Sequence, residues 1–153
     1  MKGLKDKVII VTGGAGGIGS ATCRRLAEEG AKVAIFDVNL EAAEKLANEI
    51  NNQHGQALAV QCDITQSDVV EQAVQHIEAK LGPIDGLVNN AGWDIFKPFV
   101  KSNPQEWDKL IQINLVGMLN MHFAVLKGMV ERNSGSIVNI ASDAARVGSS
   151  GEA

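Results

Sequence analysis

The feature that most restricts how this chain can fold is a run of glycines that follows a short apolar segment near its start. Residues 8–11 read Val-Ile-Ile-Val, and residues 12–19 read Thr-Gly-Gly-Ala-Gly-Gly-Ile-Gly. A continuous β-branched run is typical of a strand buried on both faces of a parallel sheet. Residues 18–29 then carry apolar side chains at helical spacing, and Gly30 stands where a helix C-terminal cap belongs. Because the turn between them presents bare amides at the positive end of a helix dipole, it predicts a bound anion, most simply a diphosphate.

The glycines can be read in two registers. Three of them fit GxGxxG, and Thr12 begins a second pattern, TGxxxGxG. A P-loop is excluded because no Lys-Ser or Lys-Thr pair follows. A methyltransferase-like glycine loop stays open on these residues alone.

The rest of the chain alternates between short apolar segments and longer amphipathic ones. The predicted strands are residues 8–11, 32–37, 57–62, 86–89 and 136–140, and the predicted helices are residues 18–29, 41–52, 66–81 and 104–131. Helical connections of this length imply right-handed crossovers and a parallel sheet covered on both faces. We therefore predict an α/β fold of the doubly wound (Rossmann) type, incomplete with about five strands, in one domain over residues 1–153. Ligands of such a sheet bind beyond the carboxyl ends of its strands.

Asp37 ends the second predicted strand, 18 residues after Gly19. At this distance from a glycine turn, a carboxylate can accept hydrogen bonds from an adenosine ribose. It also repels a 2′-phosphate, and Val38 and Asn39 follow it in place of an arginine. These features predict NAD rather than NADP as the cofactor. The alternative for Asp37 is a turn residue at a strand end.

The charge balance argues against other classes of partner. The formal net charge is −4 and the sequence pI is about 5.3, so no basic surface is expected that could neutralise a nucleic acid. The apolar run at residues 8–11 is too short for a signal-peptide core or a membrane span, which predicts a cytoplasmic protein without a membrane partner. Cys23 and Cys62 form no CxxC pair and the three histidines are scattered, so no metal site is expected.

Five features follow one another along the chain. They are the TGxxxGxG register, Cys62-Asp63-Ile64 after the third strand, Asn89-Asn-Ala-Gly92 after the fourth, Asn114 in the long helix and Ser142 after the fifth strand. Together they resemble the pattern of the short-chain dehydrogenases/reductases, and the resemblance extends from Lys5 to Ala153. It implies an enzyme that transfers a hydride between NAD and an alcohol or carbonyl carbon of a small molecule.

The resemblance also implies a role for each site residue. Contacts with the diphosphate are implied for Gly13, Gly17, Ile18 and Gly19, with the ribose for Asp37, with the adenine for Asp63 and Ile64, and with the other half of the dinucleotide for Asn90, Ala91 and Gly92. Asn89 is expected to hold strands together, and Asp63 has the alternative role of a helix N-cap. Ser142 resembles the catalytic serine that orients the substrate oxygen, and Asn114 resembles a helix asparagine that supports a water in the proton relay. An asparagine inside a helix has poor intrinsic propensity, which favours a specific hydrogen-bonding role.

The family's general acid/base is a tyrosine followed four residues later by a lysine, and this chain contains no tyrosine. The chain ends at Ala153, 11 residues after Ser142, where the helix that carries this pair would begin. We therefore expect a truncated chain that is essentially inactive alone, since general acid/base catalysis is worth a factor of about 10² to 10⁴. An unpaired strand edge and an uncovered apolar helix face favour self-association, so a homo-oligomer is expected.

Within the family, residues 89–99 and 140–153 resemble the enzymes that oxidise 2-hydroxycyclohexanecarboxyl-CoA. This implies a cyclic 2-hydroxyacyl-CoA as substrate. Trp93 and Phe96 could contact the ring of this substrate, and a CoA phosphate could bind Lys97, Lys101 or Arg146. The alternative is that these are surface or packing residues. The alternatives left open are a 3-oxoacyl thioester reductase, a sugar or polyol dehydrogenase, and a dinucleotide-binding module without catalysis.

Overall fold

A five-stranded parallel sheet forms the centre of the molecule, which confirms the predicted fold class. The computed structural model describes residues 3–148, so the ends of the predicted domain lie outside the described residues. The strands are β1 (Val8–Thr12), β2 (Lys32–Asp37), β3 (Gln56–Gln61), β4 (Ile84–Asn89) and β5 (Ser136–Asn139), in the order β3-β2-β1-β4-β5. Every neighbouring pair is parallel. The direction of winding reverses at β1, which is where a doubly wound sheet binds its ligand.

The helices follow the predicted segments closely. They are α1 (Gly17–Glu28), α2 (Leu40–Asn52), α3 (Ser67–Leu81), α4 (Pro104–Ile111), α5 (Met118–Glu131) and a short α6 (Ala144–Val147) that the sequence analysis missed. Glycines end two of them, because Gly30 after α1 has φ +83° and Gly82 after α3 has φ +106°. This left-handed region costs a residue with a Cβ more than it costs glycine.

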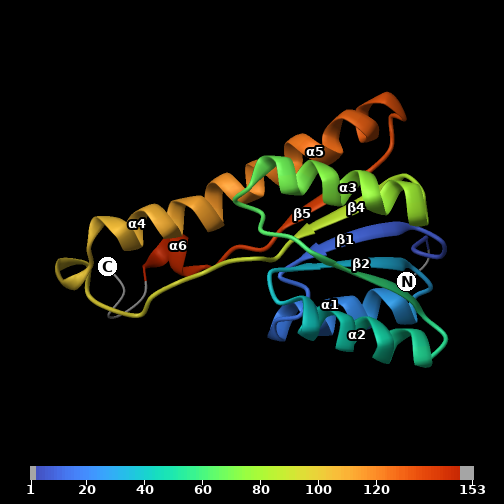
Figure 1. Cartoon of the computed structure of the whole chain (residues 1–153). Coiled ribbons are helices and arrows are strands. Elements are labelled where there is room, and N and C mark those ends of the chain that lie inside the picture. The colour runs from blue at the N-terminus through green and yellow to red at the C-terminus, as the bar shows by residue number, and fades with distance from the viewer. Residues whose placement is uncertain (1–2, 149–153) are drawn as a thin grey trace.

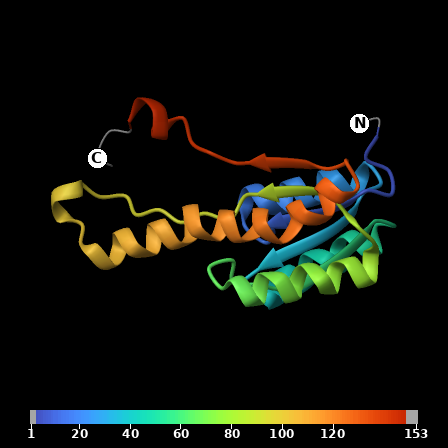
Figure 2. The ribbon, with the colours of Figure 1, turned by 90° about the horizontal axis from the view of Figure 1, so that it is seen from above.

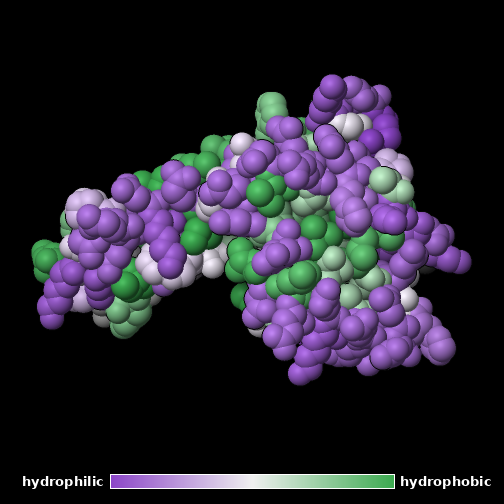
Figure 3. All heavy atoms as spheres, viewed as in Figure 1, coloured by the Kyte–Doolittle hydropathy of each residue, from purple (hydrophilic) through white to green (hydrophobic). Residues whose placement is uncertain are grey.

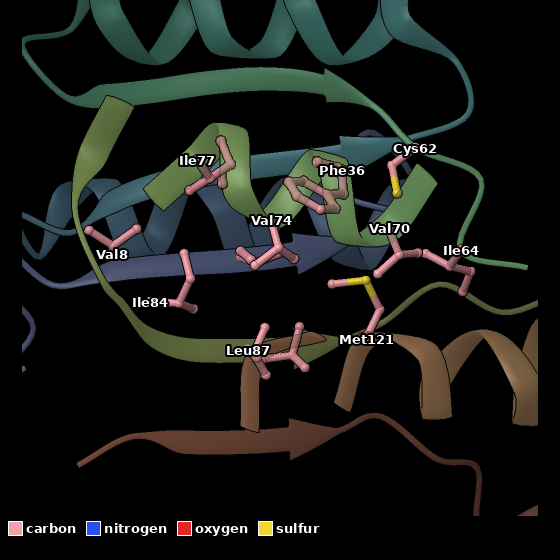
Figure 4. Close-up of a cluster of buried hydrophobic side chains, with 14 of the residues drawn as sticks. Val8, Phe36, Cys62, Ile64, Val70, Val74, Ile77, Ile84, Leu87 and Met121 are labelled. Atoms are coloured by element: carbon pink, nitrogen blue, oxygen red, sulfur yellow. The ribbon is translucent and has the colours of Figure 1, made fainter. Parts of the chain in front are cut away.

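Two apolar layers cover the sheet, one on each face. α1 and α2 lie on one face, and α3 and α5 lie on the other (Figure 1). Val8 and Ile10 of β1 join the layer under α3 and α5, whereas Ile9 and Val11 join the layer under α1 and α2. The division follows from the strand, whose successive side chains point to opposite faces. Figure 4 shows the first layer, in which Phe36 of β2 is fully buried.

A second region, which we call the arm, projects from the C-terminal edge of the sheet (Figures 1 and 2). It consists of residues 92–116 and 140–148, and we call the rest of the described chain the body. The arm contains the loop after β4, a 3₁₀ turn (Phe99–Lys101), α4, most of a π-helical turn (Gln112–Gly117), and the segment after β5 with α6. Wherever burial is described in the arm, no side chain is buried.

One helical run over residues 104–131 joins the arm to the body. The sequence predicts a single regular helix there, whereas in the structure the π-helical turn separates α4 from α5. By length and composition alone, this run could cross a membrane. Met121, Val125 and Met129 nevertheless pack into the layer against α3 and the sheet, as expected of an amphipathic helix that is part of a folded domain.

The outward side of the same run carries an apolar stripe. The exposed residues of this stripe are Trp107, Ile111, Leu115, Leu119, Phe123, Leu126 and Val130. Their spacing of three or four residues places them along one side of the helical run. Apolar residues gather along the arm in Figure 3 as well. β5 adds an open edge, because among the described strands it pairs with β4 alone and Val138 is half exposed.

Candidate functional site

A cleft of about 950 Å³ opens at the C-terminal ends of the strands. Its volume lies near the upper end of the range of about 300 to 1,000 Å³ that is usual for ligand pockets. Segments after β1, β2, β3 and β4 and the helical run after Pro104 supply its walls. The lining residues are Gly13, Gly16, Gly17, Ile18, Asp37, Val38, Cys62, Asp63, Ile64, Thr65, Asn90, Ala91, Gly92, Trp93, Lys109, Gln112 and Ile113. The predicted cofactor-binding residues thus come together in one cleft, with the exception of Gly19.

The glycine loop after β1 leaves its backbone open toward the cleft. Gly13 has φ +59°, and a Cβ there would lie 2.9 Å from the Cα of Ala91, so the position requires glycine. At Gly17, where α1 begins, an added Cβ would meet no atom within 4 Å. The first amides of a helix have no partner within the helix. The loop and the first turn of α1 therefore offer an anion a bare backbone cradle.

Gly19 lies behind this loop. It is buried, and a Cβ there would collide with the carbonyl oxygen of Gly13 and approach the side chain of Asn90. Gly19 is not among the lining residues, and its contact with a diphosphate stays a prediction. Close packing of α1 on the loop is what requires glycine here.

Asp37 lies at the end of β2 and organises the cleft wall. Its Oδ2 accepts a hydrogen bond from the backbone N–H of Ala15 at 3.0 Å, and its Oδ1 accepts one from Asn39 at 3.0 Å. A carboxylate has about four acceptor positions, so it can still accept from the hydroxyls of a ribose. Asn39 in turn caps α2 by accepting from the N–H of Ala42 at 3.1 Å. Asp37 therefore shapes its turn and remains available to a ligand.

Asp63 and Ile64 follow β3 on the same side of the cleft. Oδ1 of Asp63 accepts from the backbone N–H of Thr65 at 3.0 Å and from its hydroxyl at 2.7 Å. The cap residue of α3 is Gln66, so the alternative role of Asp63 as a helix N-cap is wrong. Oδ2 of Asp63 has no hydrogen bond within the described part of the chain, which leaves it as an acceptor at the cleft.

A hydrogen-bond network around Thr12 ties the segment after β4 to the glycine loop. The buried hydroxyl of Thr12 accepts from the backbone N–H groups of Asn90 at 3.1 Å and Ala91 at 3.0 Å. The side-chain amide of Asn90 donates to the carbonyl oxygens of Thr12 at 3.0 Å and Gly13 at 3.1 Å. The sequence analysis named Thr12 only as the first residue of the TGxxxGxG pattern and missed its structural role, although a buried threonine needs a hydrogen-bond partner.

Asn89 holds two strands together, as predicted. Its side-chain Nδ2 donates to Oδ1 of Asn139 at 2.9 Å, and its backbone carbonyl oxygen accepts from the N–H of Ile140 at 2.9 Å. These contacts join β4 to the end of β5. Asn89 therefore supports the sheet beside the cleft without lining it.

Asn114 fixes the backbone at the entrance of the arm. Its Oδ1 accepts from the N–H of Trp93 at 2.8 Å, and its Nδ2 donates to the carbonyl oxygen of Trp93 at 2.8 Å. The residue lies in the π-helical turn, and such turns occur often at functional sites. The polar partner explains an asparagine inside a helix. Asn114 itself does not line the cleft.

Ser142 lies in the arm, in the segment after β5. The residue is exposed, and its hydroxyl accepts from the N–H of Ala144 at 3.2 Å. Ser142 is not among the residues that line the cleft.

Most of the cations predicted to meet a CoA phosphate are paired within the chain. Lys97 binds Glu106 at 2.6 Å, and this hydrogen bond holds the pKa of Glu106 below its usual value. Arg146 binds Asp143 at 3.1 Å. Trp93 lines the cleft as expected of a wall residue, whereas Phe96 is exposed and does not.

Cys62 is a buried lining residue of the cleft. Burial raises the pKa of its thiol to about 12, so the group stays protonated and is a poor nucleophile at neutral pH. Within residues 3–148, no group of three or more His, Cys, Asp or Glu side chains is placed to hold a metal ion.

Comparison with known proteins gives consistent relatives. The family model described as short chain dehydrogenase matches residues 7–153. D-threitol dehydrogenase of Mycolicibacterium smegmatis is 41% identical over 94% of this chain and 55% of its own length. A 3-oxoacyl-(acyl-carrier-protein) reductase of Thermotoga maritima is 35% identical over 97% of this chain and 61% of its own. The crystal structure of NAD⁺-bound xylitol dehydrogenase superposes with a TM-score of 0.94 at 36% identity, over 99% of this chain and 58% of that one. The chain thus spans little more than half the length of these relatives.

Proposed function

This chain belongs to the short-chain dehydrogenase family, and from that membership we propose that it forms the NAD-binding domain of an oxidoreductase. The enzyme would transfer a hydride between NAD and a secondary alcohol or ketone of a small molecule. The observation that carries the proposal is the cleft, where the open glycine loop and the Asp37 carboxylate lie together. A diphosphate suits the loop and a ribose diol suits the carboxylate.

The chain's own residues divide the work of holding this dinucleotide. The backbone at Gly13, Gly17 and Ile18 would bind the diphosphate, and Asp37 would accept from the ribose and disfavour a 2′-phosphate. Oδ2 of Asp63 and the backbone N–H of Ile64 would bind the adenine. Asn90, Ala91 and Gly92 would lie along the other half, on a backbone that Thr12 holds in place. Bound NAD would supply the hydride acceptor.

The chemical step needs residues beyond this cradle. We assign Ser142 the role of orienting the substrate oxygen, and Asn114 the role of fixing the backbone that supports a water. Neither can act as the general acid/base, and the 153 residues include no tyrosine. The chain by itself would therefore bind NAD without turning over a substrate, because it lacks proton-transfer catalysis worth a factor of about 10² to 10⁴.

Titration with NAD and NADP tests the cofactor assignment. We expect NAD to bind more tightly, and Asp37→Asn to weaken NAD by about tenfold or more, as for a lost hydrogen bond to a charged group. The same variant should narrow the preference over NADP. Asp68→Asn, an exposed carboxylate in the first turn of α3, serves as the matched control. Equal affinity of the parent and Asp37→Asn for NAD would refute the assignment.

For the substrate, we propose a cyclic 2-hydroxyacyl-CoA such as 2-hydroxycyclohexanecarboxyl-CoA. The structural support is Trp93, whose indole offers an apolar wall at the cleft. Calorimetry on the NAD-saturated chain can compare cyclic hydroxyacyl-CoA, linear 3-hydroxyacyl thioesters and polyols. The cyclic thioester should bind most tightly, and a preference for a polyol or a linear thioester would replace it with one of the alternatives.

We also propose a homo-oligomer in the cytoplasm. The support for association is the exposed apolar stripe together with the open edge of β5, since large exposed apolar surfaces commonly mark interfaces. The support for the compartment is that Cys23 and Cys62 are both unpaired thiols, as is usual where disulfides do not persist.

A further inference from the structure

Lys109 is the single cation among the described residues that line the cleft. Among the described residues that line it, the charged side chains are Asp37, Asp63 and Lys109. The two carboxylates follow β2 and β3, whereas Lys109 comes from α4 and lies above Trp93, which follows β4. The cleft is therefore acidic at one end and basic at the other.

The position of Lys109 is fixed through its neighbour. Its ammonium nitrogen lies 4.2 Å from the centre of the Trp93 ring, a cation–π contact. The backbone of Trp93 is held from both sides by the carboxamide of Asn114, at 2.8 Å each. The indole is thus a platform that keeps the ammonium at the cleft.

Lys109 is also available to a ligand. Lys97 and Arg146, two of the cations considered for a CoA phosphate, are paired with Glu106 and Asp143. Lys109 has no carboxylate partner within the part of the chain that the structure describes. An ammonium contributes three donors, and a ring face occupies only one side of it.

We propose that Lys109 and Trp93 form an oxyanion subsite at the β4 end of the cleft, which takes a carboxylate or phosphate group. The oxyanion comes either from the substrate or from the diphosphate of the dinucleotide, and only this choice rests on the proposed function. Because the ammonium lies over the indole, binding of an anion changes the surroundings of Trp93 directly.

Tryptophan fluorescence offers a direct test, because the chain has only two tryptophans. Trp107→Phe leaves Trp93 as the only emitter and keeps an aromatic ring stacked on Phe99. In this background, acetate or inorganic phosphate replaces chloride at constant ionic strength, and acetamide serves as the neutral probe. We expect a saturable change in emission with both anions and none with acetamide.

The matched variants are Lys109→Met, which keeps the apolar stem, and Lys127→Met, an exposed lysine of α5 outside the cleft. Lys109→Met should lower the affinity for both anions by about threefold to fivefold, the upper range for an exposed charge pair. Lys127→Met should leave their affinities unchanged. Equal responses from Lys109→Met and the parent would overturn the subsite.

Repeating the acetate titration with saturating NAD separates the two sources of the oxyanion. A response that persists assigns the subsite to the substrate, and a response that NAD abolishes assigns it to the diphosphate. If NAD fails to bind while the Lys109-dependent anion response remains, the proposed function fails and the subsite stands.

Discussion

The body and the arm both contain helices but bury their apolar side chains to very different extents. In the body, Phe36, Ile10 and Ile35 are fully buried between the sheet and its helices. In the arm, Phe96 and Val100 are 72% and 89% exposed. The glycine-loop side of the molecule is therefore stabilised by its own core, whereas the arm has regular hydrogen bonding without a core. Substitutions of one kind should consequently have different effects in the two regions.

Truncation of a buried ring of the sheet and of an exposed ring of the outward stripe should give the largest contrast. Phe36→Ala removes a fully buried ring and should lower the free energy of unfolding by about 3–5 kcal/mol. Phe123→Ala removes a ring of the outward stripe that is 75% exposed, and should change it by less than about 0.5 kcal/mol. Urea denaturation of the two variants measures both. Similar losses would show that the stripe is covered in solution.

Two glycines of the loop separate packing from binding within the body. Gly19→Ala places a Cβ against the backbone of Gly13 and should cost about 1–3 kcal/mol of stability, as overpacking does. Gly17→Ala meets no atom and should leave stability within about 0.5 kcal/mol. The Gly17→Ala variant should still bind NAD more weakly, since its methyl group projects into the cleft. A Gly17→Ala variant that melts early, or that binds NAD like the parent, would contradict this division.

A charge in the stripe tests whether association covers it. Leu119→Glu should weaken self-association by about tenfold, because an unpaired carboxylate is costly to bury at an interface. Val147→Glu introduces the same charge at an exposed apolar position of α6 and should leave association unchanged. Sedimentation velocity over a range of concentrations gives the dissociation constants. A parent that stays monomeric throughout would rule out this use of the stripe.

The smallest contrast comes from two N-cap asparagines. Asn39 accepts from the N–H of Ala42 at the start of α2, and Asn103 accepts from that of Glu106 at the start of α4, each at 3.1 Å. Asn39→Ala should lower the free energy of unfolding by about 1 kcal/mol. Asn103→Ala should only increase hydrogen exchange in the first turn of α4, because that helix opens without the core. An equal global loss from both would mean that the arm unfolds together with the body.

The contrast between body and arm also explains how much of the fold and the site could be predicted from the sequence. The β-branched runs and the glycine caps are local signals, so the strands and the helices of the body follow from short windows. The cleft follows from parallel strands that end at one edge, which brings Asp37 and Asp63 together. The pairing of Lys109 with Trp93 depends on a contact across 16 positions in the chain, and no local pattern encodes it. For Asn114, the sequence indicated a hydrogen-bonding role but not its partner.

The π-helical turn determines how the side chains at one end of the long helical run are rotated about its axis relative to those at the other end. Ile113 lines the cleft, Gly117 lies against Ile64, and Met121 and Val125 pack into the body. In a regular α-helix, positions four apart rotate by about 40° relative to each other. A wider turn absorbs part of that rotation, so residues four apart stay aligned from the cleft to the sheet. The orientation of one cleft wall relative to the core is thus encoded in the pitch of a single turn.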